Sequence, residues 1–150
     1  MSVETNFWEV ANSVKAMELS YYWKGYGSAI FLEFGELTER FRKDGTPSNS
    51  QGQITVGIEW SWRVEDKTSI ICGSWDEEEL WQPTFDKLIG NRIKTFNLFG
   101  QLPEIELIFE TDLRVLSFAT TKGQPGWMVI DKRSKNGHSF GVTDGILNQD

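Results

Sequence analysis

The chain has 150 residues, a formal net charge of −7 at pH 7 and a single cysteine, Cys72. A chain of this length fits one domain, residues 1–150, and needs neither disulfides nor metals to form a core. The negative charge disfavours binding to nucleic acid or to anionic membrane surfaces, because both attract positive proteins. No apolar run approaches the roughly 20 residues that span a bilayer, and the N-terminus lacks signal-peptide features. Together with one cysteine, which suits a reducing compartment, these features predict a soluble cytoplasmic protein.

The first half of the chain predicts a short helix followed by five strands. Residues 5–12 place Phe7, Val10 and Ala11 on one helical face. Alternating apolar and polar residues then predict strands, and a stretch rich in Gly, Pro, Ser and Asn at residues 44–53 predicts an exposed loop. The five predicted strands cover residues 15–23, 30–34, 37–42, 54–65 and 68–72.

The second half begins with an acidic segment and then repeats the same order of elements. Ser74 and Glu77 have the spacing of a capping box, so the acidic residues 76–79 would lie at the positive end of a helix dipole. Residues 84–89 predict a second short helix, which ends at Gly90. Strands are then predicted at residues 91–99, 104–110, 113–119, 126–131 and 138–142, with a turn at Asn136-Gly137 and a frayed tail after Gly145.

The two halves resemble each other in sequence as well as in element order. The segment Trp62-Arg63-Val64-Glu65-Asp66-Lys67 matches Trp127-Met128-Val129-Ile130-Asp131-Lys132. We therefore expect an α+β fold, mainly antiparallel β, in which two tandem helix-plus-five-strand units form one pseudo-symmetric domain. The repeat units would span residues 5–73 and 84–142, and Trp62 and Trp127 would fill the core between them. The alternative is an unduplicated β-sandwich or barrel.

Few residues support a catalytic or cofactor-binding site. His138 is the only histidine, and its place beside the predicted turn at residues 136–137 indicates a surface position. One histidine and one distant cysteine do not make a zinc site, and the acidic residues 76–79 lack the ligand spacing of a calcium loop. Gly25-Tyr26-Gly27 lacks the third glycine and the following helix of a dinucleotide fingerprint. We expect no metal and no cofactor.

Two weaker patterns have structural explanations that we favour. Paired carboxylates next to tryptophans are typical of sugar-processing enzymes, but nothing in the sequence brings Glu33, Glu59 or Glu106 to working distance. Most such carboxylates are solvated surface charges.

A basic hairpin at Lys132, Arg133 and Lys135 offers one local argument for nucleic-acid binding. The net charge of the chain opposes it. Three basic residues at a hairpin tip are common on ordinary protein surfaces.

The acidic segment between the two predicted units is the candidate binding site. Tryptophans dominate the energetics of many protein interfaces, and here two of them flank a run of carboxylates. The candidate residues are Trp75, Glu77, Glu78 and Trp81. The alternative explanation is a helix that packs on the sheet through Leu80 and Trp81.

The alternation at residues 105–109, the strand at 113–118 and the strand that contains Trp127 are similar to a pattern in small bacterial proteins. Some of those resemble immunity proteins that neutralise toxins. The resemblance implies a bacterial, non-catalytic protein that binds a protein partner, and it assigns no functional residue.

Two hypotheses about function follow. The first is a non-enzymatic binding protein, immunity-like, whose acidic surface recognises a basic protein. The second is a small-ligand-binding domain or an enzyme with a cleft between the two units. Long strands also leave edges that could pair two copies into a homodimer.

Overall fold

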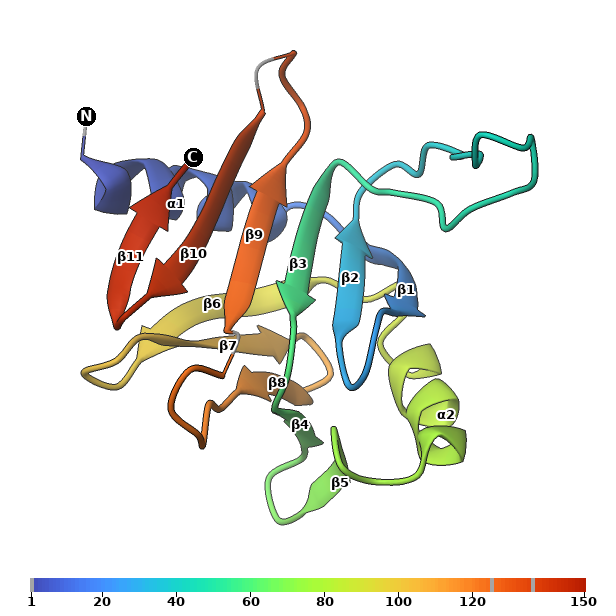
Figure 1. Ribbon diagram of the computed structural model, residues 1–150. Helices are drawn as coiled ribbons and strands as arrows, with labels where there is room; N and C mark the ends of the chain where they lie inside the picture. The colour runs from blue at the N-terminus through green and yellow to red at the C-terminus, as the bar shows by residue number, and fades with distance from the viewer. Residues whose placement is uncertain (1, 125, 136) are drawn as a thin grey trace.

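The computed structural model describes residues 2–124, 126–135 and 137–150, and it shows an α+β fold of two antiparallel sheets and two short helices (Figure 1). The helical elements are α1 (Val3–Val14), the 3-10 turn η1 (Glu78–Leu80) and α2 (Trp81–Asp86). The strands of the first half are β1 (Leu19–Lys24), β2 (Ile30–Phe34), β3 (Ile54–Ile58), β4 (Trp62–Glu65) and β5 (Ile70–Gly73). The strands of the second half are β6 (Ile93–Phe99), β7 (Glu104–Phe109), β8 (Arg114–Ser117), β9 (Trp127–Asp131), β10 (His138–Thr143) and β11 (Ile146–Gln149).

Each sheet is built from both halves of the chain. The six-stranded sheet has the order β1-β2-β3-β9-β10-β11, and the five-stranded sheet has the order β5-β4-β8-β7-β6. The chain therefore leaves the first sheet between β3 and β4, and it returns between β8 and β9. Among the described residues, no helix is long or apolar enough to cross a membrane.

The core lies between the inner faces of the two sheets, and the helices close two of its sides. Phe34 of β2 stacks on Phe109 of β7 with ring centroids 6.4 Å apart, and both side chains are fully buried. Phe7 of α1 packs against Trp127, and Phe85 of α2 packs against Trp62. Burial of these aromatic side chains supplies a large part of the driving force for folding.

The environments of Trp62 and Trp127 correspond closely. Each side chain is 3% exposed, which confirms that both belong to the core. The indole N–H of Trp62 donates to the Ser28 carbonyl at 2.7 Å, and that of Trp127 donates to the Pro103 carbonyl at 3.0 Å. Ser28 and Pro103 each lie two residues before an isoleucine, Ile30 and Ile105, whose strands pair in the same way with their neighbours.

The register of the leading strands also corresponds between the two sheets. In the first sheet β1 pairs with β2, with Leu19 opposite Phe34 and an irregularity directly after Leu19. In the second sheet β6 pairs with β7, with Ile93 opposite Phe109 and an irregularity directly after Ile93. Both pairings then continue without a further irregularity, to Lys24 opposite Ile30 in the first sheet and to Phe99 opposite Glu104 in the second.

Two of the strand predictions and the prediction of a frayed tail are wrong. Residues 37–42 form no strand; they make only isolated bridges, Thr38 to Gln51 and Phe41 to Pro47, in an arm that lies outside both sheets. Residues 54–65 are two strands, because the chain bends at Trp60 to cross from one sheet to the other. The tail after Gly145 is ordered as β11, which pairs with β10. The predicted turn at 136–137 falls partly outside the described residues.

The capping prediction for the acidic segment is also wrong. The Ser74 hydroxyl accepts a hydrogen bond from the Trp62 backbone N–H at 3.2 Å, so it ties β4 to the next turn instead of capping a helix. Helix α2 begins later, at Trp81, and includes Pro83 in its first turn, where the missing N–H has no helical partner to lose. The first helix is longer than predicted, since the Ser2 hydroxyl caps it at the Thr5 N–H.

Candidate functional site

The acidic segment, residues 75–80, lies on the surface along its whole length. Trp75 is 68% exposed and Leu80 is 50% exposed, so two large apolar side chains stand at the ends of four consecutive carboxylates. Isolated apolar side chains on a surface need no explanation, whereas here an exposed tryptophan and an exposed leucine lie in one short segment with four carboxylates.

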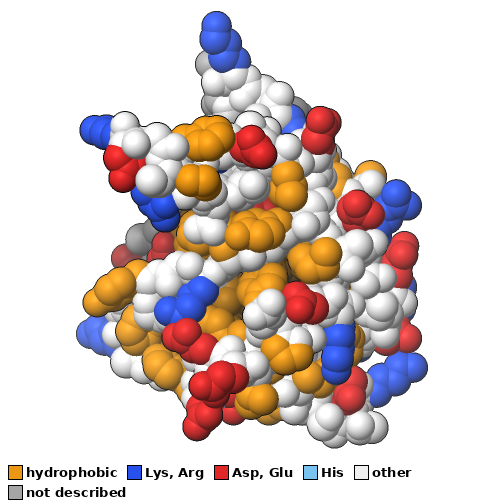
Figure 2. Space-filling view, turned by 90° about the vertical axis from the view of Figure 1, so that its right-hand side faces the viewer, with side chains coloured by type: hydrophobic (Ala, Val, Ile, Leu, Met, Phe, Trp, Pro, Cys, Tyr) orange, Lys and Arg blue, Asp and Glu red, His pale blue; other side chains and the backbone are white. Residues whose placement is uncertain are grey.

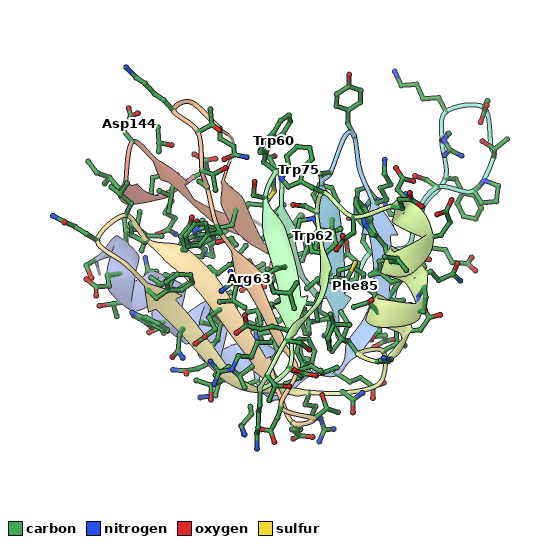
Figure 3. The ribbon with its side chains drawn as sticks, turned by 90° about the horizontal axis from the view of Figure 1, so that it is seen from below. Trp60, Trp62, Arg63, Trp75, Phe85 and Asp144 are labelled. Carbon is green, nitrogen blue, oxygen red and sulfur yellow. The ribbon has the colours of Figure 1, made fainter. Side chains whose placement is uncertain are left out.

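Several interactions hold the acidic segment in one conformation. The Trp75 ring meets the Trp60 ring edge-on, with centroids 5.6 Å apart, and Figure 3 shows the two rings together, away from the buried Trp62 and Phe85. The Asp76 carboxylate accepts a hydrogen bond from the Gly73 N–H at 2.7 Å. A fixed segment loses less conformational entropy when it binds a partner.

The structure divides the four predicted site residues into three surface residues and one core residue. Trp75, Glu77 and Glu78 are exposed, whereas Trp81 is 4% exposed. The Trp81 ring packs edge-on against Trp62 at 4.9 Å, and its indole N–H donates to the Asp76 carbonyl at 3.3 Å. Trp81 therefore supports the acidic segment from beneath. The alternative explanation, a helix that packs on the sheet through Leu80 and Trp81, is right about Trp81 and wrong about Leu80, which is exposed.

A groove of about 530 Å³ lies beside the acidic segment, between β1 and the helical elements η1 and α2. Figure 2 views this face, and it shows hydrophobic side chains gathered across the centre with acidic and basic side chains around them. The strand side of the groove is formed by Ser20, Tyr21, Tyr22, Trp23 and Lys24. The helical side is formed by Glu78, Trp81, Gln82, Asp86 and Ile89, with Asn49 at one end.

Charged side chains lie on both sides of this groove, and one ion pair joins its two walls. The Lys24 ammonium lies 3.3 Å from the Glu78 carboxylate and 5.9 Å from the centre of the Trp81 ring. Tyr22 stacks on Phe85 at 4.7 Å, and burial, followed by the nearby Asp86 carboxylate, raises the pKa of its hydroxyl. The groove is thus lined by the aromatic residues Tyr22, Trp23 and Trp81, with the carboxylates of Glu78 and Asp86 on its helical side.

Sequence reasoning missed most of the residues that line the groove. Tyr21, Tyr22 and Trp23 follow one another in an ordinary strand pattern, which does not reveal a groove. One available signal was the four-residue spacing of Gln82 and Asp86, which places both side chains on one helical face.

The structure does not bring the carboxylates of Glu33 and Glu106 into one site. Glu33 lies in the six-stranded sheet, fully buried, where it accepts hydrogen bonds from Trp23 Nε1 at 2.8 Å and the Gly52 N–H at 3.0 Å. Glu106 lies in the five-stranded sheet and pairs with Arg114 at 3.2 Å. The two carboxylates therefore do not form the pair that glycoside hydrolysis requires.

Two of the three basic residues predicted at the hairpin tip lie in ion pairs with carboxylates. The Lys132 ammonium points to the buried Glu33 carboxylate at 3.5 Å, and Arg133 pairs with Asp131 at 2.9 Å. His138 is exposed and lies 3.2 Å from the Gln149 side chain. Within residues 2–124, 126–135 and 137–150, no group of three His, Cys, Asp or Glu side chains is placed to hold a metal ion.

Comparison with known proteins identifies no relative. No protein-family model, no curated protein and no solved structure matches the chain.

Proposed function

We propose that the chain is a non-enzymatic binding protein, immunity-like in kind, that recognises a basic protein partner through the acidic segment. The observation that carries this proposal is the exposure of Trp75 beside four surface carboxylates, in a segment that the buried Trp81 contacts through the Asp76 carbonyl. A rigid tryptophan provides the apolar contact of an interface hot spot, and the surrounding carboxylates provide orientation and faster association with a positive partner. The bacterial and cytoplasmic setting follows from the sequence resemblance.

The charge balance of the chain supports the same proposal. A net charge of −7 on 150 residues attracts basic partners over a distance of about one Debye length, roughly 8–10 Å at physiological salt. The acidic segment contributes Asp76, Glu77, Glu78 and Glu79 to that charge. Only Glu78 lies in a salt bridge with a described residue, Lys24.

We further propose that the two halves descend from one duplicated unit and form a pseudo-symmetric domain. The support is the matching environment of Trp62 and Trp127, together with the matching strand order β1-β2-β3-β9-β10 and β6-β7-β8-β4-β5. In this arrangement each unit contributes its last two strands to the sheet of the other.

The alternative of a ligand-binding cleft between the two units has less support. The junction contains the stacked and fully buried rings of Phe34 and Phe109. The groove between β1 and α2 lies at the margin of the sandwich instead.

The proposal is tested by affinity capture of a partner from a bacterial lysate, with purified wild-type protein and matched variants as bait. Trp75→Ala, and separately Glu77→Gln with Glu78→Gln, should abolish or greatly weaken recovery of a stoichiometric partner. Phe118→Ala is the control for exposed aromatic area, because Phe118, directly after β8, is 49% exposed.

Retention of the same partner by the Trp75→Ala bait would overturn the choice of surface. Recovery of no stoichiometric partner under several salt conditions would overturn the proposed function itself. Size-exclusion chromatography of the bait alone tests the homodimer.

A further inference from the structure

On β1, one of the two edge strands of the six-stranded sheet, some backbone groups beside the groove make no hydrogen bond to another described residue. β1 pairs with β2 on one side only. At its start, the N–H and C=O of Leu19 point away from β2 and bond to Asn91 and Gly90 at 2.9 and 2.7 Å. At its end, the Gly25 N–H points toward β2 and bonds to Ala29 at 2.9 Å.

These two fixed points determine the direction of the groups between them. Along an antiparallel strand, the backbone N–H and C=O groups of one residue bond to the partner strand and those of the next residue point away from it. One extra residue directly after Leu19 shifts this alternation by one position. The N–H and C=O groups of Tyr22 and Lys24 therefore point away from β2. Both residues line the groove beside η1 and α2.

The opposite wall of the groove presents polar side chains at a regular spacing. Glu78 lies in η1, and Gln82 and Asp86 lie four residues apart on one face of α2; all three line the groove. Asp86 is exposed and lies in no salt bridge with a described residue, while Glu78 shares the Lys24 ammonium.

The spacing of this wall matches the repeat of an extended peptide. From Glu78 to Asp86 the chain makes about three steps at the 3-10 rise and five at the α-helical rise, roughly 13–14 Å in all, and four residues of a strand cover about 13 Å. Basic side chains at positions i and i+4 of an added strand would therefore lie opposite Glu78 and Asp86. Alternate side chains would lie toward Tyr21 and Trp23.

We infer that the groove binds an extended basic peptide segment, which adds to β1 as a further strand and pairs its lysines or arginines with Glu78 and Asp86. Backbone hydrogen bonds to Tyr22 and Lys24 supply affinity, and the two carboxylates supply the preference for basic side chains. The inference rests on the proposed function, because the segment belongs to the protein partner recognised by the adjacent acidic segment.

A second copy of this chain fits the groove less well than a single peptide strand. Its own β1 edge lies beside its own α2, so pairing of the two edges would bring both helices to the same place. The carboxylates of Glu78 and Asp86 on each copy would then face each other, which is unfavourable for like charges. One end of the edge is also occupied by Gly90 and Asn91.

The first experiment uses the wild-type protein and a synthetic peptide with lysines four residues apart, Ac-Thr-Lys-Val-Thr-Val-Lys-Thr-NH2. Amide hydrogen exchange, measured by NMR, should slow at Tyr22 and Lys24 when the peptide is added. A peptide with glutamates in place of the lysines should bind at least tenfold more weakly. Equal binding of the two peptides, or protection only at sites remote from β1, would overturn the inference.

The second experiment separates the backbone of β1 from its side chains. Lys24→Ala keeps the outward N–H of residue 24, whereas Lys24→Pro removes it without removing a hydrogen bond to β2. Loss of one backbone hydrogen bond should weaken peptide binding by about fivefold to tenfold in Lys24→Pro relative to Lys24→Ala. Asp86→Asn should also weaken binding, and high salt should remove that difference.

Equal affinities of Lys24→Pro and Lys24→Ala for the peptide would overturn strand addition. If Lys24→Pro still captures the protein partner while Trp75→Ala does not, the proposed function stands and strand addition fails. If neither variant affects capture, strand addition fails and so does the choice of the acidic segment as the binding surface. A peptide-sensitive dimer of the protein alone would assign the β1 edge to a second copy.

Discussion

Replacement of each core tryptophan by phenylalanine tests the correspondence between the two halves quantitatively. Trp62→Phe and Trp127→Phe each keep an aromatic ring and remove an indole N–H. In Trp62→Phe the Ser28 carbonyl loses its donor in a buried position, and in Trp127→Phe the Pro103 carbonyl loses its donor in a partly buried position.

The expected losses of stability follow from these environments. The smaller ring leaves about 40 Å³ unfilled, which costs about 1 kcal/mol at roughly 24 cal/mol per Å³. A buried carbonyl without a partner adds about 1–2 kcal/mol, and a carbonyl that water can reach adds less. We expect Trp62→Phe to lower the free energy of unfolding by about 2–3 kcal/mol and Trp127→Phe by about 1–2 kcal/mol.

Urea denaturation, followed by circular dichroism, measures both values. Trp75→Phe is the matched control, because Trp75 is 68% exposed and the change should alter the free energy of unfolding by less than about 0.5 kcal/mol. If either core variant is as stable as the Trp75→Phe control, the corresponding roles that we assign to Trp62 and Trp127 are refuted.

Three further predictions concern polar and reactive groups. The Arg133 guanidinium holds the pKa of Asp131 below its usual value, so Asp131→Asn should lower the free energy of unfolding by about 1 kcal/mol at pH 7. In urea denaturation, the difference in this free energy between wild type and variant should disappear as the pH falls below about 4, because the Asp131 carboxylate of the wild type is then protonated. In Glu33→Gln the amide N–H₂ faces either the Trp23 N–H or the Gly52 N–H, so two donors meet and one hydrogen bond is lost. The free energy of unfolding should fall by about 2 kcal/mol. An unchanged thermal midpoint would contradict the hydrogen bonding assigned to Glu33. Burial raises the pKa of the Cys72 thiol, so a thiol reagent at pH 8 should label it only after unfolding in urea, and rapid labelling of the native protein would contradict its burial.

Local patterns in the sequence predicted the α+β class and several strand positions well, because residue alternation reports directly which side chains are buried. The inward faces of β2 and β7 are examples, with Phe34 and Phe109 fully buried. Alternation does not report which sheet a strand joins. The pattern over residues 54–65 therefore continues through the bend at Trp60, although β3 and β4 belong to different sheets.

Other differences arise from contacts between residues far apart in the sequence. Residues 37–42 alternate as a strand would, but Thr38 and Phe41 find partners only within their own arm, at Gln51 and Pro47. Ser74 has the spacing of a helix cap, but its hydroxyl accepts a hydrogen bond from the backbone N–H of Trp62 in β4 instead. In both cases a tertiary partner decides the outcome, and local propensity does not.

The candidate site was predictable in composition but not in shape. The run of carboxylates between Trp75 and Trp81 is visible in the sequence, whereas the burial of only one of these tryptophans depends on packing against Trp62. The groove exists because Leu19 bonds to Gly90 and Asn91, and this contact brings β1 beside α2.

Hydrogen exchange of the protein bound to its captured partner shows directly which surface the partner covers. We predict slower amide exchange at residues 75–80 and at the β1 edge, with the outer face of the five-stranded sheet unchanged. Protection on the five-stranded sheet, with residues 75–80 exchanging as in the free protein, would contradict it.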